Sequence, residues 1–271
     1  MTKISCWIAV FLAGTILPRP SLGLDVLHTF NSTIPAAGYA PVAGLIQASD
    51  GDFYGTTRNG GTNGECGTVF KISPDGMFRS LASFNVTNGL YPSEKLLEGS
   101  DGNFYGTTEI GGTNNLGTVF KMTPTGTITT LVTFDGANGD TPSSQLIRGF
   151  DGNYYGTTFY GAPDESTGFG TIFKMTAAGN LTTLAYFANT NGSYPTSLVQ
   201  AHDGNFYGTT FYGGLLIPAL APDGYGTVFK MTPKGDVTTL VMFDGLNGLA
   251  PDYGLVEWND DNFYGMARFG S

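Results

Sequence analysis

The chain has 271 residues, of which 41 are Gly and 14 are Pro, and its 22 acidic residues against 12 Lys and Arg give a formal charge of -10 at pH 7. A Gly share of about 15%, roughly twice the usual value, disfavours long helices and suits a protein of short strands and tight turns. The 41% of hydrophobic residues, with 20 Phe and 14 Tyr, argue against disorder, and the negative charge argues against nucleic acids and anionic membranes as partners.

The first 23 residues have the features of a secretory signal peptide. Lys3 precedes an apolar run of 14 residues, 4–17, which ends at a Pro-Arg-Pro segment. Ser21 and Gly23 are small residues at the spacing of a signal-peptidase site, so we expect cleavage after Gly23. A membrane anchor is the alternative, but the run is shorter than the roughly 20 residues that span a bilayer. No second run of this kind follows, so the sequence predicts a secreted or surface-bound chain with no membrane insertion after signal removal.

The two cysteines agree with this interpretation. Cys6 would leave with the signal peptide, and Cys66 would remain alone. The mature chain would then have neither an intrachain disulfide nor a zinc site built from cysteines. We therefore expect its stability to come from packing.

The rest of the chain, residues 24–271, repeats one unit of about 50 residues. Its first landmark, Asp-Gly-Asn-Phe-Tyr-Gly-Thr-Thr with small variations, recurs at spacings of 51, 50, 52 and 57 residues, beginning at Asp50, Asp101, Asp151, Asp203 and Asp260. A second landmark, Gly-Thr-Val/Ile-Phe-Lys, begins at Gly67, Gly117, Gly170 and Gly226. A third, Thr-Leu-x-x-Phe as at residues 130–134, is followed eight residues later by a Pro and then by a short apolar pair.

Each unit is predicted to form four short strands, which we call a to d in chain order. Strand a is the apolar pair, strand b contains Phe-Tyr-Gly-Thr-Thr, strand c contains Thr-Val-Phe-Lys, and strand d contains Thr-Leu-x-x-Phe. Asp-Gly between a and b, and Pro-x-Gly between c and d, are tight-turn signals. Four strands in a period near 50 residues are typical of a blade of an all-β, kelch-like β-propeller. A β-solenoid, with its shorter repeats, and a row of small sandwiches are the alternatives.

The two ends of the chain hold parts of units. Residues 24–30 match strand d alone, and the residues from 255 onward match strands a and b only. In a closed ring the N-terminal strand would complete the last blade, but strand c of that blade is missing, which leaves edge groups unpaired. We expect about five blades with the last one incomplete. A defective ring is one explanation, and a longer repeat protein truncated at its C-terminus is the favoured one.

The pattern Tyr-Gly-Thr-Thr-x-x-Gly-Gly, then Gly-Thr-Val-Phe-Lys-Met-Thr-Pro-x-Gly and Thr-Thr-Leu-x-x-Phe, is clearest over residues 105–134. It resembles the GloVer tandem repeat, and the resemblance covers nearly all of residues 24–271. The resemblance implies a bacterial, exported protein whose relatives often end in one of several surface-sorting anchors ("choice-of-anchor"). No such anchor follows the repeats here, in line with the expected truncation. The resemblance carries no catalytic or binding residue over to this chain.

The b–c loops are the variable part of the unit. From the second Thr of strand b to the Gly of the next landmark they span 10, 9, 12 and 16 residues. In a meander the b–c and d–a loops share one face of the ring, and variation on a fixed frame favours a binding face there. The pairs of residues directly after Thr-Thr include aromatic pairs in two adjacent blades, which suit stacking on sugar rings or on an apolar partner. The predicted binding residues are Arg58, Asn59, Phe159, Tyr160, Phe211, Tyr212, Arg268 and Phe269.

The alternative for these aromatic residues is ordinary packing between neighbouring blades. The longest loop contains an apolar stretch, residues 215–222, which suits a cap on this face or a contact with another protein. Polysaccharide or a surface protein are the expected partners.

Metal binding and catalysis find little support in the sequence. The Asp-Gly-Asn turns offer oxygen atoms, but Ca²⁺ takes about six to eight ligands, and turn chemistry already accounts for Asp and Asn. His28 and His202 give no Ser-His-acid arrangement. Carboxylate pairs for glycoside cleavage arise by chance among 22 acidic residues, for instance from Glu94, Glu109, Asp164, Glu165 and Asp252. We expect no metal, no cofactor and no catalytic residue.

The sequence thus predicts an exported, non-enzymatic β-propeller that binds polysaccharide or a surface protein through its b–c/d–a face. The first alternative is a carbohydrate-cleaving enzyme, a lyase or glycoside hydrolase with carboxylates near the propeller channel. The second is a structural component of a surface layer.

Overall fold

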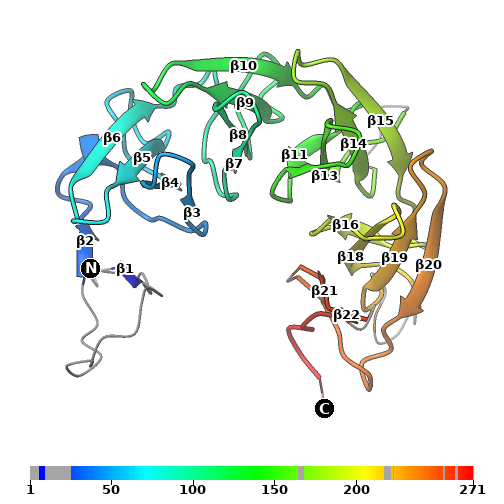
Figure 1. Ribbon diagram of the computed structural model, residues 1–271. Coiled ribbons are helices and arrows are strands. Elements are labelled where there is room, and N and C mark those ends of the chain that lie inside the picture. The colour runs from blue at the N-terminus through cyan, green and yellow to red at the C-terminus, as the bar shows by residue number, and fades with distance from the viewer. Residues whose placement is uncertain are drawn as a thin grey trace, which may run out of the picture.

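The protein folds into a row of antiparallel sheets. The computed structural model describes residues 6–9 (backbone only), 26–163, 168–216, 221, 223–252, 254–259 and 262–270, so most of the predicted signal peptide lies outside the described residues. The single helical element among them is the 3₁₀ turn η1 (Pro35–Ala37). Figure 1 shows the sheets side by side in an arc whose two ends face each other across an opening. The predicted all-β propeller of four-stranded blades is confirmed.

Four sheets contain the complete units, each with its strands in the order a, b, c, d. The first contains β3 (Ile46–Gln47), β4 (Phe53–Thr57), β5 (Thr68–Ile72) and β6 (Phe78–Ser83). The second contains β7 (Leu97–Glu98), β8 (Phe104–Thr108), β9 (Thr118–Met122) and β10 (Ile128–Thr133). The third contains β12 (Ile147–Arg148), β13 (Tyr154–Tyr160), β14 (Thr171–Met175) and β15 (Leu181–Tyr186), with β11 (Asp140–Pro142) added beside β13. The fourth contains β17 (Val199–Gln200), β18 (Phe206–Tyr212), β19 (Thr227–Met231) and β20 (Val237–Met242), with β16 (Ser193–Pro195) added beside β18.

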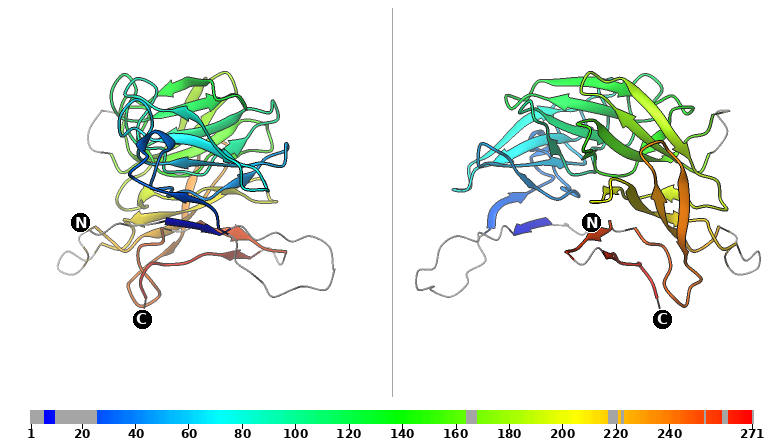
Figure 2. Two further views of the ribbon diagram at one scale, coloured as in Figure 1. Left: turned by 90° about the vertical axis from the view of Figure 1, so that its left-hand side faces the viewer. Right: turned by 45° about the vertical axis from the view of Figure 1, so that its right-hand side comes forward.

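The partial units lie at the two ends of the arc. At the C-terminal end, β21 (Val256–Glu257) and β22 (Phe263–Tyr264) form a two-stranded sheet, which is the predicted incomplete blade. At the N-terminal end, β2 (Val26–Phe30) pairs with β1 (Cys6–Ala9). Figure 2 shows β1 and the β21–β22 hairpin at the open side of the arc.

Relative to β2, strand β1 lies where strand c lies relative to strand d in the complete units. It pairs with β2 in the register of strands c and d of the complete units, including the irregularity in the middle of the pair. In that register Ala9 takes the position that Phe70 holds in the first unit. Because β1 falls inside the predicted signal peptide, cleavage after Gly23 would remove it.

Two contacts that recur in every complete unit explain why the same Thr, Gly and Phe residues recur in strands b and c. The second Thr of strand b shares a buried hydrogen bond of 2.7–2.8 Å with the Thr of strand c in all four complete units. The ring of the strand-c Phe lies across the strand-b Gly. A Cβ atom on that Gly would lie 2.5–2.7 Å from Cζ of the Phe, in the pairs Gly55–Phe70, Gly106–Phe120, Gly156–Phe173 and Gly208–Phe229. No larger residue fits at the Gly without moving a buried ring.

Two rows of ring contacts join neighbouring units. In the first, the Tyr of strand b packs against the first aromatic residue of the next strand b, with centroids 4.1–4.5 Å apart, as in the stacked pair Tyr105–Tyr154. In the second, the Phe after strand d packs on the Phe of the next strand c, with centroids 4.9–5.5 Å apart, as in Phe134–Phe173. Phe30 makes this second contact with Phe70, so β2 occupies the strand-d position that its sequence predicts. The core therefore lies between the sheets.

The repeated Asp and Lys residues fix the a–b turn. The carboxylate of Asp101 accepts hydrogen bonds from the amide groups of Asn103 and from the Tyr105 hydroxyl, and Lys121 contacts it at 3.2 Å. Burial alone would raise the pKa of this carboxyl, but these hydrogen bonds outweigh burial and hold the pKa well below its usual range. The corresponding carboxyls of Asp151 and Asp203 behave in the same way. These residues therefore have a structural role.

Candidate binding site

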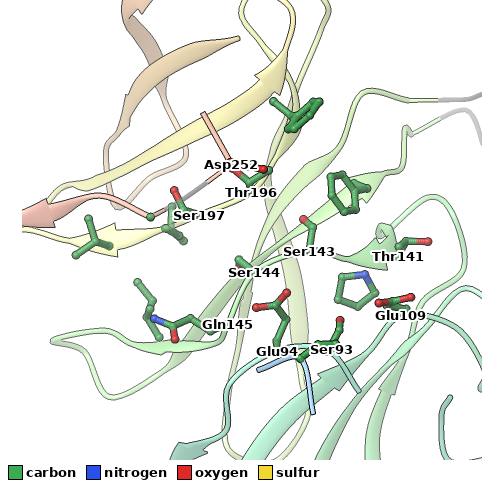
Figure 3. Close-up of a pocket in the computed structure, with 18 of the residues that line it drawn as sticks. Ser93, Glu94, Glu109, Thr141, Ser143, Ser144, Gln145, Thr196, Ser197 and Asp252 are labelled. Carbon is green, nitrogen blue, oxygen red and sulfur yellow. The ribbon is translucent and has the colours of Figure 1, made fainter. Parts of the chain in front are cut away.

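A cavity of about 890 Å³ opens between the loops of successive units, and we call it the central cavity. Two kinds of position supply most of its lining. The first is the residue directly after the Thr-Thr pair, namely Arg58, Glu109, Phe159, Phe211 and Arg268. The second is the segment after the repeated Pro, which contributes Val42, Ser93, Glu94, Ser143, Ser144, Gln145, Thr196, Ser197 and Asp252. Figure 3 shows the polar residues of both kinds converging from neighbouring units.

The structure separates the predicted binding residues into two groups. Arg58, Phe159, Phe211 and Arg268 line the central cavity. The residue after each of them pairs instead with the backbone of the preceding d–a loop, in the pairs Tyr39–Asn59, Asp140–Tyr160, Ser193–Tyr212 and Leu249–Phe269. Successive side chains of an extended chain point to opposite sides, so the two members of each predicted pair diverge.

The second group includes an aromatic cluster beside the cavity. The ring of Tyr194 lies 5.2 Å from that of Tyr160 and 5.9 Å from that of Tyr212, and so joins the two predicted aromatic pairs. Tyr160 is 42% exposed and Tyr212 is 36% exposed, so both offer ring surface to solvent. Phe159 contacts Tyr194 as well, with centroids 6.2 Å apart. Contacts between units and exposure to solvent thus coexist in this cluster.

The residue before each repeated Pro has a left-handed backbone. The φ angles lie between 51° and 58° at Ala40, Tyr91, Thr141, Tyr194 and Ala250. This conformation is costly for a residue with a side chain, and α-type conformations are further disfavoured before Pro. Each of the last four donates its N–H to a carbonyl of the neighbouring b–c loop, at 2.8–3.0 Å. The turn leads the chain into the residues that line the central cavity.

The two arginines of the cavity wall face carboxylates. Arg58 contacts Glu109 with both Nε and Nη2, at 3.2 and 2.6 Å, and its guanidinium carbon lies 4.6 Å from the centre of the Tyr91 ring. The hydrogen bond with Glu109 raises the pKa of Arg58. Arg268 lies 3.7 Å from Oδ2 of Asp252. The other carboxylate oxygen of Asp252, Oδ1, is buried and has no hydrogen-bond partner among the described residues.

Glu94 is the unpaired acid of the cavity. Burial raises the pKa of Glu94 to about 7, and the nearby charge of Glu109 adds to the rise. Among the described residues, no side chain or backbone group makes a hydrogen bond with its carboxyl. Figure 3 shows the carboxyl directed into the cavity on the side of Ser144. Near neutral pH this group is therefore present in both its neutral and its charged form.

The hydroxyl groups of Ser143 and Thr196 bind to the next unit, whereas the hydroxyl of Ser144 keeps a free O–H. Ser143 Oγ donates to the Pro195 carbonyl at 2.6 Å, and Thr196 Oγ1 donates to the Pro251 carbonyl at 3.1 Å. Ser144 Oγ accepts the N–H of Thr157 at 3.0 Å. The O–H of Ser144 has no acceptor within the described part of the chain, so it can donate to a bound molecule.

Sequence reasoning missed Tyr91, Tyr194 and the serines and threonines after the repeated Pro. The residues directly before and after the repeated Pro differ between units, and this variation could have indicated that they belong to the binding face. Asp164 and Glu165 lie outside the described residues, as does most of the predicted apolar stretch 215–222. Over the ranges that the structure covers, no group of three or more His, Cys, Asp or Glu side chains is placed to hold a metal ion. Nor does any helix in those ranges have the length and apolar character to cross a membrane.

Solved β-propeller structures share the fold. Virginiamycin B lyase from Staphylococcus aureus is 16% identical, with a TM-score of 0.54, over 82% of this chain and 68% of the lyase. The PQQ-bound aldose sugar dehydrogenase from Streptomyces coelicolor is 13% identical, with a TM-score of 0.53, over 80% of this chain and 72% of that one. The extracellular domain of a putative hybrid two component system from B. thetaiotaomicron is 13% identical, with a TM-score of 0.53, over 84% of this chain and 27% of that one. Identities this low show a common fold alone, and the kelch-like subtype stays a prediction.

No curated protein sequence matches the chain. A family model does match it, over residues 14–216 and 152–271, and that model describes the Gloeobacter/Verrucomicrobia repeat. The repeated landmarks from Asp50 to Asp260 fall inside these matches. The chain belongs to the Gloeobacter/Verrucomicrobia repeat family.

Proposed function

We propose that this protein binds a neutral polysaccharide in the central cavity. One observation carries the proposal: the residues that line the cavity change from unit to unit at repeated positions, and they combine hydroxyl, carboxyl and amide groups with the rings of Phe159 and Phe211 and with aliphatic side chains. Sugars are recognised by polar groups that meet their hydroxyls and by aromatic faces that meet their C–H surfaces. A concave wall that offers both polar groups and aromatic rings favours such a ligand over a protein surface.

The charges of the cavity wall and of the whole chain favour a neutral polysaccharide over an anionic one. Arg58 is engaged by Glu109, and Arg268 faces Asp252, so both cations of the wall are matched by acids. The chain as a whole carries a formal charge of -10. Polymers of uronic acids or sulfated sugars would meet repulsion here, whereas neutral sugars would not.

The proposal includes export of the chain. Residues 1–23 serve as its signal peptide, and the polysaccharide is a cell-envelope or environmental one. The apolar run after Lys3, its small-residue end and the absence of a second such run in the sequence support this location.

Two double variants test the site. Phe159→Ala with Phe211→Ala removes the aromatic residues of the central cavity and is expected to weaken binding of a neutral oligosaccharide at least tenfold. Tyr160→Ala with Tyr212→Ala changes the adjacent positions of the same strands, which do not line the cavity. We expect it to leave affinity within about twofold, measured by titration calorimetry. Loss of binding in the tyrosine variant alone would place the site on the aromatic cluster instead.

Cleavage of the bound polysaccharide is a second candidate function, favoured by the position of Glu94 and by its pKa of about 7. A carboxyl that is neutral below that pH can donate a proton to a glycosidic oxygen. If this function holds, release of reducing ends falls as pH rises through about 7, and Glu94→Gln abolishes it while oligosaccharide binding persists. If a polysaccharide that binds yields neither reducing ends nor unsaturated sugars at pH 5–8, the protein is a binding module only.

A further inference from the structure

Glu94 is an acidic residue at a position where the repeated frame does not need one. It is the second residue after the repeated Pro, and the corresponding residues of neighbouring units are Ala43, Ser144 and Ser197. The two serines accept the N–H of the first Thr of strand b, at 3.0 and 3.2 Å, and so stabilise their units. Among the described residues, Glu94 accepts no hydrogen bond of this kind. The fold of the unit therefore does not account for the Glu94 carboxyl.

This carboxyl is enclosed by the protein and faces the central cavity. Glu94 lines the cavity, and Figure 3 shows its carboxyl directed into the open space. Enclosing an acid that has no partner is costly, which is why burial raises the pKa of Glu94 to about 7. A ligand group that carries a positive charge and donates hydrogen bonds would remove this cost.

The other charges of the cavity wall are matched. The lining includes three acidic and two basic residues. Arg58 lies 2.6 Å from Glu109, and Arg268 lies 3.7 Å from Asp252. Glu109 is the charged residue that acts on the pKa of Glu94, and it raises that pKa further. The unmatched negative charge of the wall is therefore that of Glu94.

We infer that the sugar unit beside Glu94 carries a free amino group, whose ammonium form donates hydrogen bonds to the Glu94 carboxylate. This inference rests on the proposed function and adds one amine-bearing sugar to a polysaccharide that is otherwise neutral. Hydrogen bonds between an ammonium and a carboxylate are roughly twice as strong as those between neutral groups. The free O–H of Ser144, on the same side of the cavity, can donate to a hydroxyl of the same sugar.

Three tetrasaccharides of β-1,4-linked glucose units that differ only at carbon 2 test the inference. They carry a hydroxyl, an N-acetylamino or an amino group there. We expect the amino form to bind the full chain at least about tenfold more tightly than either of the others, because a hydrogen bond to a charged group contributes about 1.5–3 kcal/mol. Titration calorimetry at pH 7 measures the three affinities.

Two substitutions of Glu94 assign the preference to its carboxyl. Glu94→Gln keeps the shape and removes the charge, and Glu94→Ser introduces the residue that the next unit has at this position. In both variants we expect the amino and N-acetylamino forms to bind within about twofold of each other, with the N-acetylamino form bound as by the unchanged protein. Asp236→Asn is the control, since it removes one negative charge at an exposed c–d turn outside the cavity. We expect it to keep the preference.

The pH dependence gives a second readout. Over about pH 5.5 to 7.5 the sugar amine mostly keeps its proton, as α-amino groups with a pKa of about 8 do. The affinity for the amino form should therefore rise as Glu94 ionises through about pH 7, and its binding should release protons. The affinity for the N-acetylamino form should stay constant. Cleavage with Glu94 as the proton donor would show the opposite trend, because it falls over the same range.

Four outcomes would overturn the inference. If a neutral form binds as tightly as the amino form, Glu94 does not select an amine, and the proposed function stands. If Glu94→Gln keeps the preference, the amine binds elsewhere. If propylammonium, an amine without a sugar, binds as tightly as the amino form, the site takes any cation, including a Lys side chain of a protein. If none of the three tetrasaccharides binds to the folded chain, the inference is wrong, and the proposed function then depends on other neutral oligosaccharides.

Discussion

Replacing Phe173 by alanine is expected to lower the free energy of unfolding by about 3–5 kcal/mol, the range for deleting a buried Phe side chain. Phe173 is 0% exposed, packs on Phe134 of the preceding unit and lies across Gly156 of its own. The substitution therefore opens a cavity at the junction of two units. Urea unfolding at pH 7, followed by tryptophan fluorescence and circular dichroism, measures the change.

Phe150→Ala is the control for this prediction, because Phe150 is 69% exposed in an a–b turn. We expect that control to stay within about 0.5 kcal/mol of the unchanged protein, as surface substitutions usually do. A loss below about 1 kcal/mol for Phe173→Ala would mean that the contact between neighbouring units does not carry the stability assigned to it here.

Replacing Gly208 by valine is expected to be at least as disruptive, costing about 3 kcal/mol or more through overpacking. A Cβ atom at this position would lie 2.2 Å from the Ser197 carbonyl oxygen and 2.5 Å from Cζ of Phe229. The first of these is backbone and cannot rotate away. We expect low soluble yield and a lowered midpoint of thermal unfolding.

The fifth unit provides an internal control for the glycine prediction. Gly265 has the same place in the repeated sequence, but a Cβ there comes closer than 3.9 Å only to the flexible end of the Leu255 side chain. Gly265→Val is therefore expected to change the free energy of unfolding by less than about 0.5 kcal/mol. If the two valine variants are equally stable, strand-b Gly is not retained for the ring that crosses it.

Much of the fold can be predicted from the sequence because each unit contains the residues that determine its turns and its strand contacts. Asp-Gly and Pro-x-Gly mark the turns, and Thr, Gly and Phe recur at positions where the structure shows a shared hydrogen bond or a crossing ring. Because the unit recurs, these signals are visible within this one sequence. The strands and turns that recur in each unit were therefore predictable.

Only part of the candidate site was predictable, because its geometry depends on backbone conformation that no repeated residue type indicates. Arg58 and Phe159 were found from their place after Thr-Thr, but alternation along the strand carries the residue after each of them away from the cavity. The lining after each Pro depends on a left-handed residue that is Ala, Tyr or Thr, and no residue type signals that conformation. The sequence does not distinguish Glu94 from the other acidic residues, because its raised pKa comes from its burial in the fold.

The register of β1 was beyond sequence reasoning for another reason. Residues 6–9 have the composition of a signal peptide, and against Gly-Thr-Val/Ile-Phe of the second landmark only Ile8 matches. Their pairing with β2 depends on backbone hydrogen bonds, which almost any extended segment can supply.

We propose that the central cavity binds neutral sugar polymers. Titration calorimetry of the full chain against two sets of oligosaccharides of equal length, neutral and uronic acid-based, tests it most directly, with EDTA present in a parallel series. We expect one-to-one binding of at least one neutral oligosaccharide, no binding of the anionic set, and no effect of EDTA. Binding of the anionic set alone, or no binding by a folded sample across both sets, would contradict the account.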